Sequence, residues 1–231
     1  MGVKRYFAAS DNTITNAYEE NLTTRATGSN MGASDILEVF SIYGQADSGS
    51  AEKSRALLKF NATASTNSIK YDRDNSVIPA SGSVTFYLKL FNTPHGQTLP
   101  KDFTMDISAI SSAWTEGRGL DMDLYKDKGI SNWVSRFTSS SGILDWSTQG
   151  GDYITNPSCS FSSANAATGH VHLGLLPDEG LGVFISDTYE SATRSYYTKK
   201  FFGRGTEFFF KRPIIEARWD SSTKDHRGDF Y

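Results

Sequence analysis

Two histidines in this 231-residue chain have a spacing that could support chemistry. His170 and His172 alternate, so in a strand both would lie on one face and could bind a transition metal. No cysteine or carboxylate lies close enough in sequence to complete a tetrahedral set, so ordinary strand or loop histidines are the favoured interpretation. His95 lies in a predicted turn and His226 in a charged tail, and neither flanks a nucleophile motif.

Three closely spaced aspartates are the weak metal candidates. Their carboxylates could supply the oxygen ligands that calcium prefers, but the glycine and the terminal glutamate of an EF-hand loop are missing. A solvated loop with local ion pairs is therefore the favoured interpretation, and we expect no bound cofactor. The candidates are Asp121, Asp123 and Asp127.

No catalytic or nucleotide-binding motif is present in the sequence. It contains no Gly-x-Ser-x-Gly elbow, phosphate-binding loop, dinucleotide fingerprint or His-Glu-x-x-His pair. The single cysteine, Cys159, has no histidine or basic neighbour in sequence to activate a thiolate. A formal charge of -3 provides no global positive field for a nucleic-acid backbone. The sequence predicts a protein that is not an enzyme and does not bind nucleic acid.

Aromatic residues offer two kinds of binding surface. Trp114 and Trp146 are candidates for stacking on a sugar ring, with a core position as the alternative. The C-terminal stretch combines rings and arginines, which is the composition of an interface core. Its terminal strand could equally close the chain's own sheet. The predicted interface residues are Phe208, Phe209, Phe210, Arg212, Arg218, Trp219, Arg227, Phe230 and Tyr231.

The elements that position these residues are predicted to be mostly strands. Residues 84–90 and 103–109 alternate between apolar and polar side chains, as strands with one buried face do. Further strands are predicted over 4–9, 36–43, 54–60, 181–187, 196–202 and 207–219, the last with a break at Pro213. Many short strands separated by Ser, Thr, Asn and Gly clusters indicate a sandwich or barrel. We expect an all-β, antiparallel, jelly-roll-like β-sandwich with one short helix and long loops.

The predicted helix covers residues 130–137. Ile130, Trp133, Val134 and Phe137 would form one apolar stripe on it, which could pack over an open end of the sandwich. At this length one core is favoured over two. We therefore expect a jelly-roll-like sandwich over 1–205 and a C-terminal segment over 206–231, docked on the sandwich or on a neighbouring subunit.

Short motifs in the first half of the chain carry a family resemblance. They are DNTI at 11–14, NMG at 30–32, LEV at 37–39, RALLKF at 55–60, the strand 84–90 and WTEG at 114–117. In this order they resemble the DNRLRE-type jelly-roll domains, which are relatives of carbohydrate-binding modules. The chain lacks the motif that names that family and a secretory signal, so a secreted polysaccharide role is not expected.

Later motifs carry a second resemblance. They are NW at 132–133, Trp146, GGDY at 150–153, the stretch 209–220 and DHRG at 225–228. They resemble virion structural proteins of tailed bacteriophages, especially marine ones. This resemblance implies capsid decoration, a neck or tail accessory, or baseplate or fibre attachment.

The phage resemblance also implies the partners and the location of the protein. The expected partners are other virion structural proteins and further copies of the chain, with no membrane contact, and the expected location is the virion, assembled in the host cytoplasm. The alternative is a carbohydrate-binding module that recognises a host surface glycan.

Overall fold

The structure of the chain is a computed structural model, and antiparallel β-sheet dominates it. It describes residues 1–43, 51–80, 83–94, 103–122, 130–162, 169–170, 178–192 and 195–222, with only the backbone of 155–162 and 169–170. The predicted all-β sandwich is confirmed. No helix in these ranges is long and apolar enough to cross a membrane.

The strands of the described ranges are β1 (Gly2–Thr15), β2 (Ile36–Tyr43), β3 (Ala51–Phe60), β4 (Val84–Lys89), β5 (Thr104–Ile110), β6 (Ser135–Ser139), β7 (Gly142–Asp145), β8 (Tyr153–Ser162), β9 (Gly169–His170), β10 (Leu181–Ile185), β11 (Tyr196–Phe202) and β12 (Ile214–Trp219). Two α-helices, α1 (Ile69–Asp74) and α2 (Asp187–Glu190), and a 3-10 turn, η2 (Phe209–Lys211), join them. The predicted bounds of β2 and β11 are confirmed, whereas β6, β7 and β8 were not predicted.

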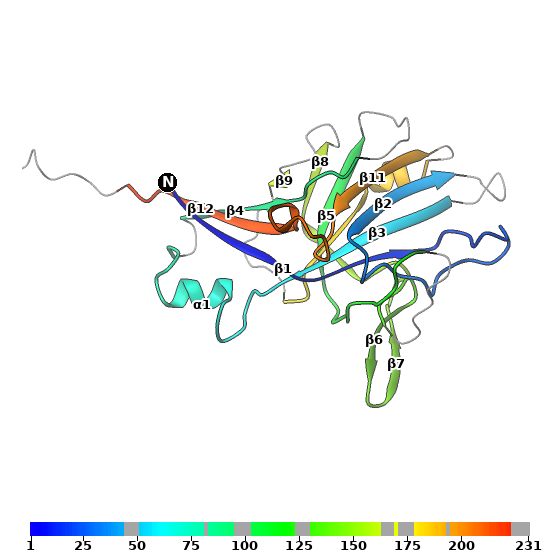
Figure 1. Cartoon of the computed structure of the whole chain (residues 1–231), viewed down its shortest axis with the longest axis horizontal. Coiled ribbons are helices and arrows are strands. Elements are labelled where there is room, and N and C mark those ends of the chain that lie inside the picture. The colour runs from blue at the N-terminus through cyan, green and yellow to red at the C-terminus, as the bar shows by residue number, and fades with distance from the viewer. Residues whose placement is uncertain are drawn as a thin grey trace, which may run out of the picture.

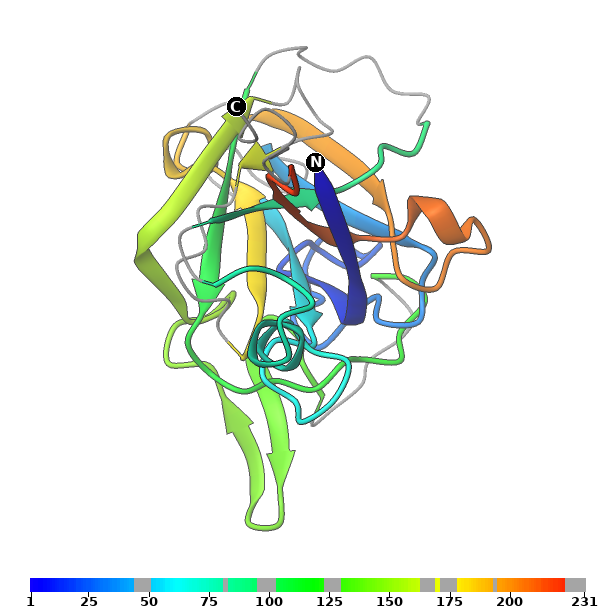
Figure 2. The ribbon, with the colours of Figure 1, turned by 90° about the vertical axis from the view of Figure 1, so that its left-hand side faces the viewer.

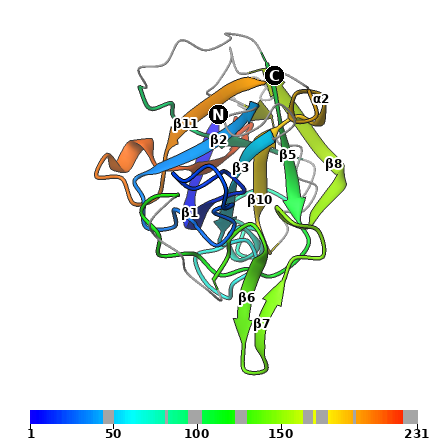
Figure 3. The same cartoon turned by 90° about the vertical axis from the view of Figure 1, so that its right-hand side faces the viewer.

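Strand β1 connects the two layers of the fold. Its residues 2–7 pair with β12, its residues 8–15 pair with β3, and a β-bulge lies between Ala8 and Ser10. A bulge bends its strand, so β1 can leave one layer and enter the other. The strand order is β8-β5-β10-β3-β1-β12-β4-β9, with β2 and β11 continuing from β3. Figure 1 shows β1 between β12 and β3, and Figure 3 shows β3, β10, β5 and β8 side by side.

The larger hydrophobic core lies between the two layers. Inward-facing residues of β1, β4 and β12 meet those of β2, β3, β5, β10 and β11, including Tyr6, Phe86, Leu88, Ile215, Val39, Leu58, Met105, Val183 and Phe201. Helix α1 closes one end of this core with Ile69, and the Ser68 hydroxyl caps it by accepting the Tyr71 amide. Asp72 of α1 accepts the Tyr6 hydroxyl at 2.8 Å, which ties the helix to β1.

A second, smaller core lies on the opposite face of β1, β3 and β5. It contains Ile14, Leu57, Ile110, Trp114, Trp133 and Trp146. The β6–β7 hairpin projects from the body beside this core (Figures 1 and 2). The sandwich therefore buries side chains on both faces of one sheet.

The predicted helix over 130–137 is wrong. The Asn132 side-chain oxygen accepts the backbone amides of Val134 at 2.8 Å and Ser135 at 2.7 Å, and β6 begins at once. Such local bonds compete with helix formation, because they satisfy the amides in a turn. Trp133 enters the second core, whereas Phe137 lies on the projecting hairpin. The burial of Trp133 in the second core therefore decides the structure of this segment, and the helical spacing of its apolar residues does not.

The predicted strand over 207–219 is correct only from Ile214 onward. Residues 209–211 form η2, and the Arg212 guanidinium folds back to donate to the Thr206 carbonyl at 3.0 and 3.1 Å. Pro213 follows and has no amide to donate to a sheet ladder. A turn that the Arg212–Thr206 hydrogen bonds hold together, and not a strand, therefore precedes β12.

Candidate interaction surface

Strand β12 lies inside the sheet, between β1 and β4. Its residues Ile215 and Ala217 belong to the larger core, and Trp219 packs against that core. The alternate residues Ile214, Glu216 and Arg218 therefore face the other side of the sheet. The described part of the predicted C-terminal segment thus contributes core residues and a row on the opposite side of the sheet, in which Ile214 and Glu216 are buried and Arg218 is partly exposed.

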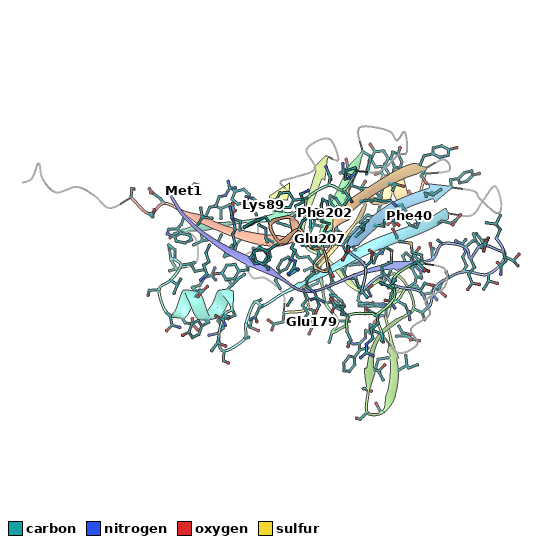
Figure 4. The ribbon with its side chains drawn as sticks, viewed as in Figure 1. Met1, Phe40, Lys89, Glu179, Phe202 and Glu207 are labelled. Atoms are coloured by element: carbon teal, nitrogen blue, oxygen red, sulfur yellow. The ribbon has the colours of Figure 1, made fainter. Side chains whose placement is uncertain are left out.

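A buried carboxylate organises three cations on that outer side. Glu216 is 2% exposed and binds Arg5 at 2.8 Å, Lys89 at 2.7 Å and Arg218 at 2.6 Å. Burial alone would raise the pKa of Glu216, but hydrogen bonds from Lys89, Arg5 and Arg218 lower it to about 2. One carboxylate thus compensates one of three positive charges, and the cluster keeps a net charge of +2. Figure 4 labels Lys89 at the end of β4.

The turn before β12 exposes three successive phenylalanines. Phe208 is 49% exposed, Phe209 48% and Phe210 79%. The Phe208 ring packs on Phe202 with centroids 5.7 Å apart, and Lys211 lies over both rings at 4.6 Å. Figure 4 labels Phe202 and Glu207, which flank Gly203–Thr206 in the sequence, and Figure 2 shows the turn standing out from the body in orange. Exposed aromatic rings that follow one another in this way make the turn a candidate interaction site.

Side-chain and backbone bonds anchor this turn to the first half of the chain. The Gly203 amide donates to the Asp35 carbonyl at 2.7 Å, and the Arg204 amide donates to the Asp11 carboxylate. The Arg204 guanidinium pairs with both carboxylate oxygens of Glu116, at 2.7 and 3.1 Å. These bonds fix the start of the turn that carries the phenylalanines.

The exposed turn and the cation cluster form one continuous surface, the aromatic-basic face. Phe7 joins them, because its ring centroid lies 4.6 Å from that of Phe209 and its strand also carries Arg5. On the far side, the Arg218 guanidinium lies 4.5 Å from the Tyr87 ring centroid. The face consists of Arg5, Phe7, Tyr87, Lys89, Phe208, Phe209, Phe210, Lys211, Arg212, Glu216 and Arg218.

The structure brings most of the described interface candidates together. Phe208, Phe209, Phe210, Arg212 and Arg218 lie on the aromatic-basic face. Trp219 lies on the core side of β12, and Arg227, Phe230 and Tyr231 fall outside the described residues.

Sequence reasoning missed Tyr87 and Lys211 as members of this face, and it also missed four charged or aromatic residues of β1, β4 and β12: Arg5, Phe7, Lys89 and Glu216. Their alternation within predicted strands was visible in the sequence, but the pairing of β1 and β4 with β12 was not. That pairing alone places the four side chains beside the aromatic turn.

The two tryptophans predicted to stack on sugar are buried. Trp114 and Trp146 are each 5% exposed and belong to the second core. Their indole nitrogens donate to the Glu179 carbonyl at 2.7 Å and the Asn132 carbonyl at 2.9 Å. Neither ring presents a free face to a pyranose, so stacking at these two positions is corrected to a core role.

No metal cluster is found among the described residues. Asp121 is described, whereas Asp123 and Asp127 lie outside the described residues. The structure gives the backbone of His170 in β9 and of Cys159 in β8, and His95, His172 and His226 fall outside the described ranges.

The chain matches no protein-family model and no curated protein sequence. The physical properties of the aromatic-basic face are therefore the basis on which function can be proposed. That face combines exposed rings and guanidinium groups, the residue types that are enriched at interface centres.

The buried carboxylate of Asp11 gives the anchor a pH dependence. Burial raises the pKa of Asp11 to about 6, against the hydrogen bond from the Arg204 amide. The folded state then binds a proton more tightly than the unfolded state, so this group adds stability as the pH falls through 6. We expect the unfolding free energy of the wild type to rise by about 1 to 1.5 kcal/mol relative to that of Asp11→Asn between pH 7.5 and pH 5.

Urea unfolding followed by tryptophan fluorescence at the two pH values measures this difference. The wild type should gain stability relative to Asp11→Asn on acidification, because asparagine takes up no proton. An identical pH dependence in both proteins would show that Asp11 titrates normally.

Proposed function

We propose that this chain is a structural protein of a tailed-bacteriophage virion and acts through protein–protein contacts of its aromatic-basic face. The observation that supports this most directly is the anchored turn with Phe208, Phe209 and Phe210 exposed beside Arg212. Phenylalanine and arginine are enriched at interface centres, and about half or more of each of the three rings is exposed to solvent. The resemblance of residues 209–220 to phage virion proteins points in the same direction.

The partner of the face is another virion protein or a further copy of the chain. Repetition in a closed ring or lattice multiplies individually modest contacts, so even a weak pairwise interface holds once several engage together. Assembly in the host cytoplasm before release is the location that accompanies this proposal. A glycan-binding role receives less support, because the two tryptophans that could have stacked on sugar lie in the second core.

Point substitutions in the turn test the proposal better than truncation. Truncation after Gly205 would remove β12 from between β1 and β4 and would unfold the sheet. Phe208→Ser combined with Phe210→Ser removes two exposed rings. The loss of the Phe208 contact with Phe202 should lower the unfolding free energy by about 0.5 to 1.5 kcal/mol, and the Phe210 change by no more than about 0.5 kcal/mol. We expect at least a tenfold loss of the chain from purified phage particles, measured by quantitative mass spectrometry.

A matched control removes apolar surface from a different exposed place. Ile143→Ser combined with Leu144→Ser acts on the β6–β7 hairpin, where both side chains are exposed. This control should be incorporated as the wild type is. Normal incorporation of the turn variant, or equal loss of both variants, would refute the role of the turn.

A further inference from the structure

One edge of β1 is open over its first residues. The Ala8 amide donates to the Pro213 carbonyl at 3.0 Å, in line with the register of β1 and β12. Hydrogen-bonded positions alternate along an antiparallel pair, so the backbone groups of Val3 and Arg5 point away from β12. Strand β3 joins this edge only from Ala8 onward. No described residue bonds the backbone of Val3 or Arg5.

A pocket of about 210 Å³ lies along the same edge. Four consecutive residues of β1, positions 4–7, line it together with Asn61, Asn67 and Asp72. Successive side chains of a strand point to opposite faces of the sheet. A pocket that contacts four successive residues therefore lies beside the edge of the strand and not on one face. Small-molecule sites usually enclose about 300 Å³ or more. The pocket is therefore small for a cofactor, and it has room for side chains of a segment that lies along the strand.

The outer face beside this edge is positive and partly apolar. The Arg5 side chain is 54% exposed, and the single carboxylate of Glu216 compensates only one of the three cations around it. Phe7 and Phe209 stack next to Arg5 on the same face. Carboxylates placed along this row would form charge-assisted hydrogen bonds, which are stronger than neutral ones.

We propose that the open edge of β1 binds an extended, acidic segment of a partner protein as an added β-strand. The backbone of Val3 and Arg5 supplies the main-chain bonds, alternate carboxylates of the segment lie over Arg5, and intervening side chains enter the pocket beside Asn61 and Asn67. This inference rests on the proposed function, and it names the kind of partner segment that binds beside the aromatic-basic face. The added strand would lie beside Phe7 and so extend the same face.

Two other roles for this edge give different results. Cations on an edge strand also block edge-to-edge pairing with further copies, and then Arg5→Gln would cause self-association. A basic face with aromatic rings could instead bind a nucleic acid, and then an oligonucleotide would bind with a steep salt dependence. Each outcome is distinguishable from peptide binding.

Selection from a displayed library of random ten-residue peptides against the full chain tests the proposal. We expect enriched peptides with Asp or Glu at every second position. Binding of a synthetic enriched peptide should weaken at least tenfold in Val3→Pro, because proline removes an amide that β12 does not use. Arg5→Gln should weaken it similarly, whereas Lys70→Gln, an exposed cation of α1, should bind as the wild type does.

Amide hydrogen exchange measured by NMR tests the proposal on the wild-type protein alone, so the result does not depend on whether a variant folds. The amides of Val3 and Arg5 should slow at least tenfold when the peptide binds, whereas those of Lys4 and Tyr6, already in the ladder with β12, should be protected in both states. Enrichment without acidic residues, unchanged exchange at Val3 and Arg5, self-association of Arg5→Gln, or oligonucleotide binding would each overturn the proposal.

The outcome is separable from that of the proposed function. If the strand addition fails while Phe208→Ser with Phe210→Ser still blocks particle incorporation, the interface role of the turn stands and only the partner segment is wrong.

Discussion

Glu216→Gln is expected to lower the free energy of unfolding by about 3 kcal/mol at pH 7, because each unit of pKa shift corresponds to about 1.4 kcal/mol. The carboxylate is buried between Arg5, Lys89 and Arg218 and has a pKa of about 2 in place of 4.5. Glutamine keeps the shape but removes the charge, so three cations would repel one another across β1, β12 and β4. Urea unfolding followed by tryptophan fluorescence measures the loss.

The pH dependence of the same variant gives an independent check. A lowered pKa means that the unfolded state binds the proton more tightly, so the stabilisation is complete above about pH 4.5 and is lost as the pH falls toward 2. Wild type should lose this contribution across that window, and Glu216→Gln should have none to lose. Glu207→Gln, at an exposed position, is the matched control. Equal acid profiles for wild type and Glu216→Gln would contradict the assignment.

Glu190→Leu is expected to lower the free energy of unfolding by about 3 to 5 kcal/mol, since it leaves a buried guanidinium without its partner. Arg55 of β3 binds both carboxylate oxygens of Glu190, at 2.7 and 3.2 Å, and donates to the Gly150 carbonyl at 3.2 Å. Its guanidinium also lies over the rings of Trp133, Tyr153 and Phe184. The pair therefore links α2 to the second core.

The double variant Arg55→Met/Glu190→Leu should recover part of that loss, because well-packed apolar residues often replace a buried ion pair at little cost. Recovery should be incomplete, because Lys53 also binds Glu190, at 3.3 Å, and loses this partner. Asp74→Asn, which removes an exposed pair with Lys70, should cost less than about 1 kcal/mol. Thermal and urea unfolding of the four proteins provide the comparison. A Glu190→Leu protein as stable as the Asp74→Asn control would show that Arg55 finds other partners.

The two carboxylates at the anchor and at the face respond to acid in opposite directions. Asp11 adds stability as the pH falls through 6, whereas Glu216 loses its contribution only below about 4.5. The anchored turn and the cation cluster should therefore both be intact at pH 5. Binding experiments on the aromatic-basic face are best carried out between about pH 4.5 and pH 6.

Strand periodicity was readable from the sequence because each strand has one buried face. The bounds predicted for β2 and β11 match the structure, and β4 and β5 differ from prediction by one residue at one or both ends. The helix over 130–137 failed because the Asn132 turn and the burial of Trp133 are tertiary choices that an apolar stripe does not encode. The core role of Trp114 and Trp146 likewise depends on which sheet face is covered.

The sequence by itself determined the all-β class and the position of a stretch rich in rings and arginines. Only the tertiary structure decided that β12 lies between β1 and β4, because strand pairing joins residues more than two hundred positions apart. That pairing turns Glu216 from one charge among many into the buried partner of Arg5, Lys89 and Arg218. A period of two in the sequence shows which residues of a strand share a face. The neighbouring strands and their register, which tertiary packing fixes, decide which other side chains lie on that face.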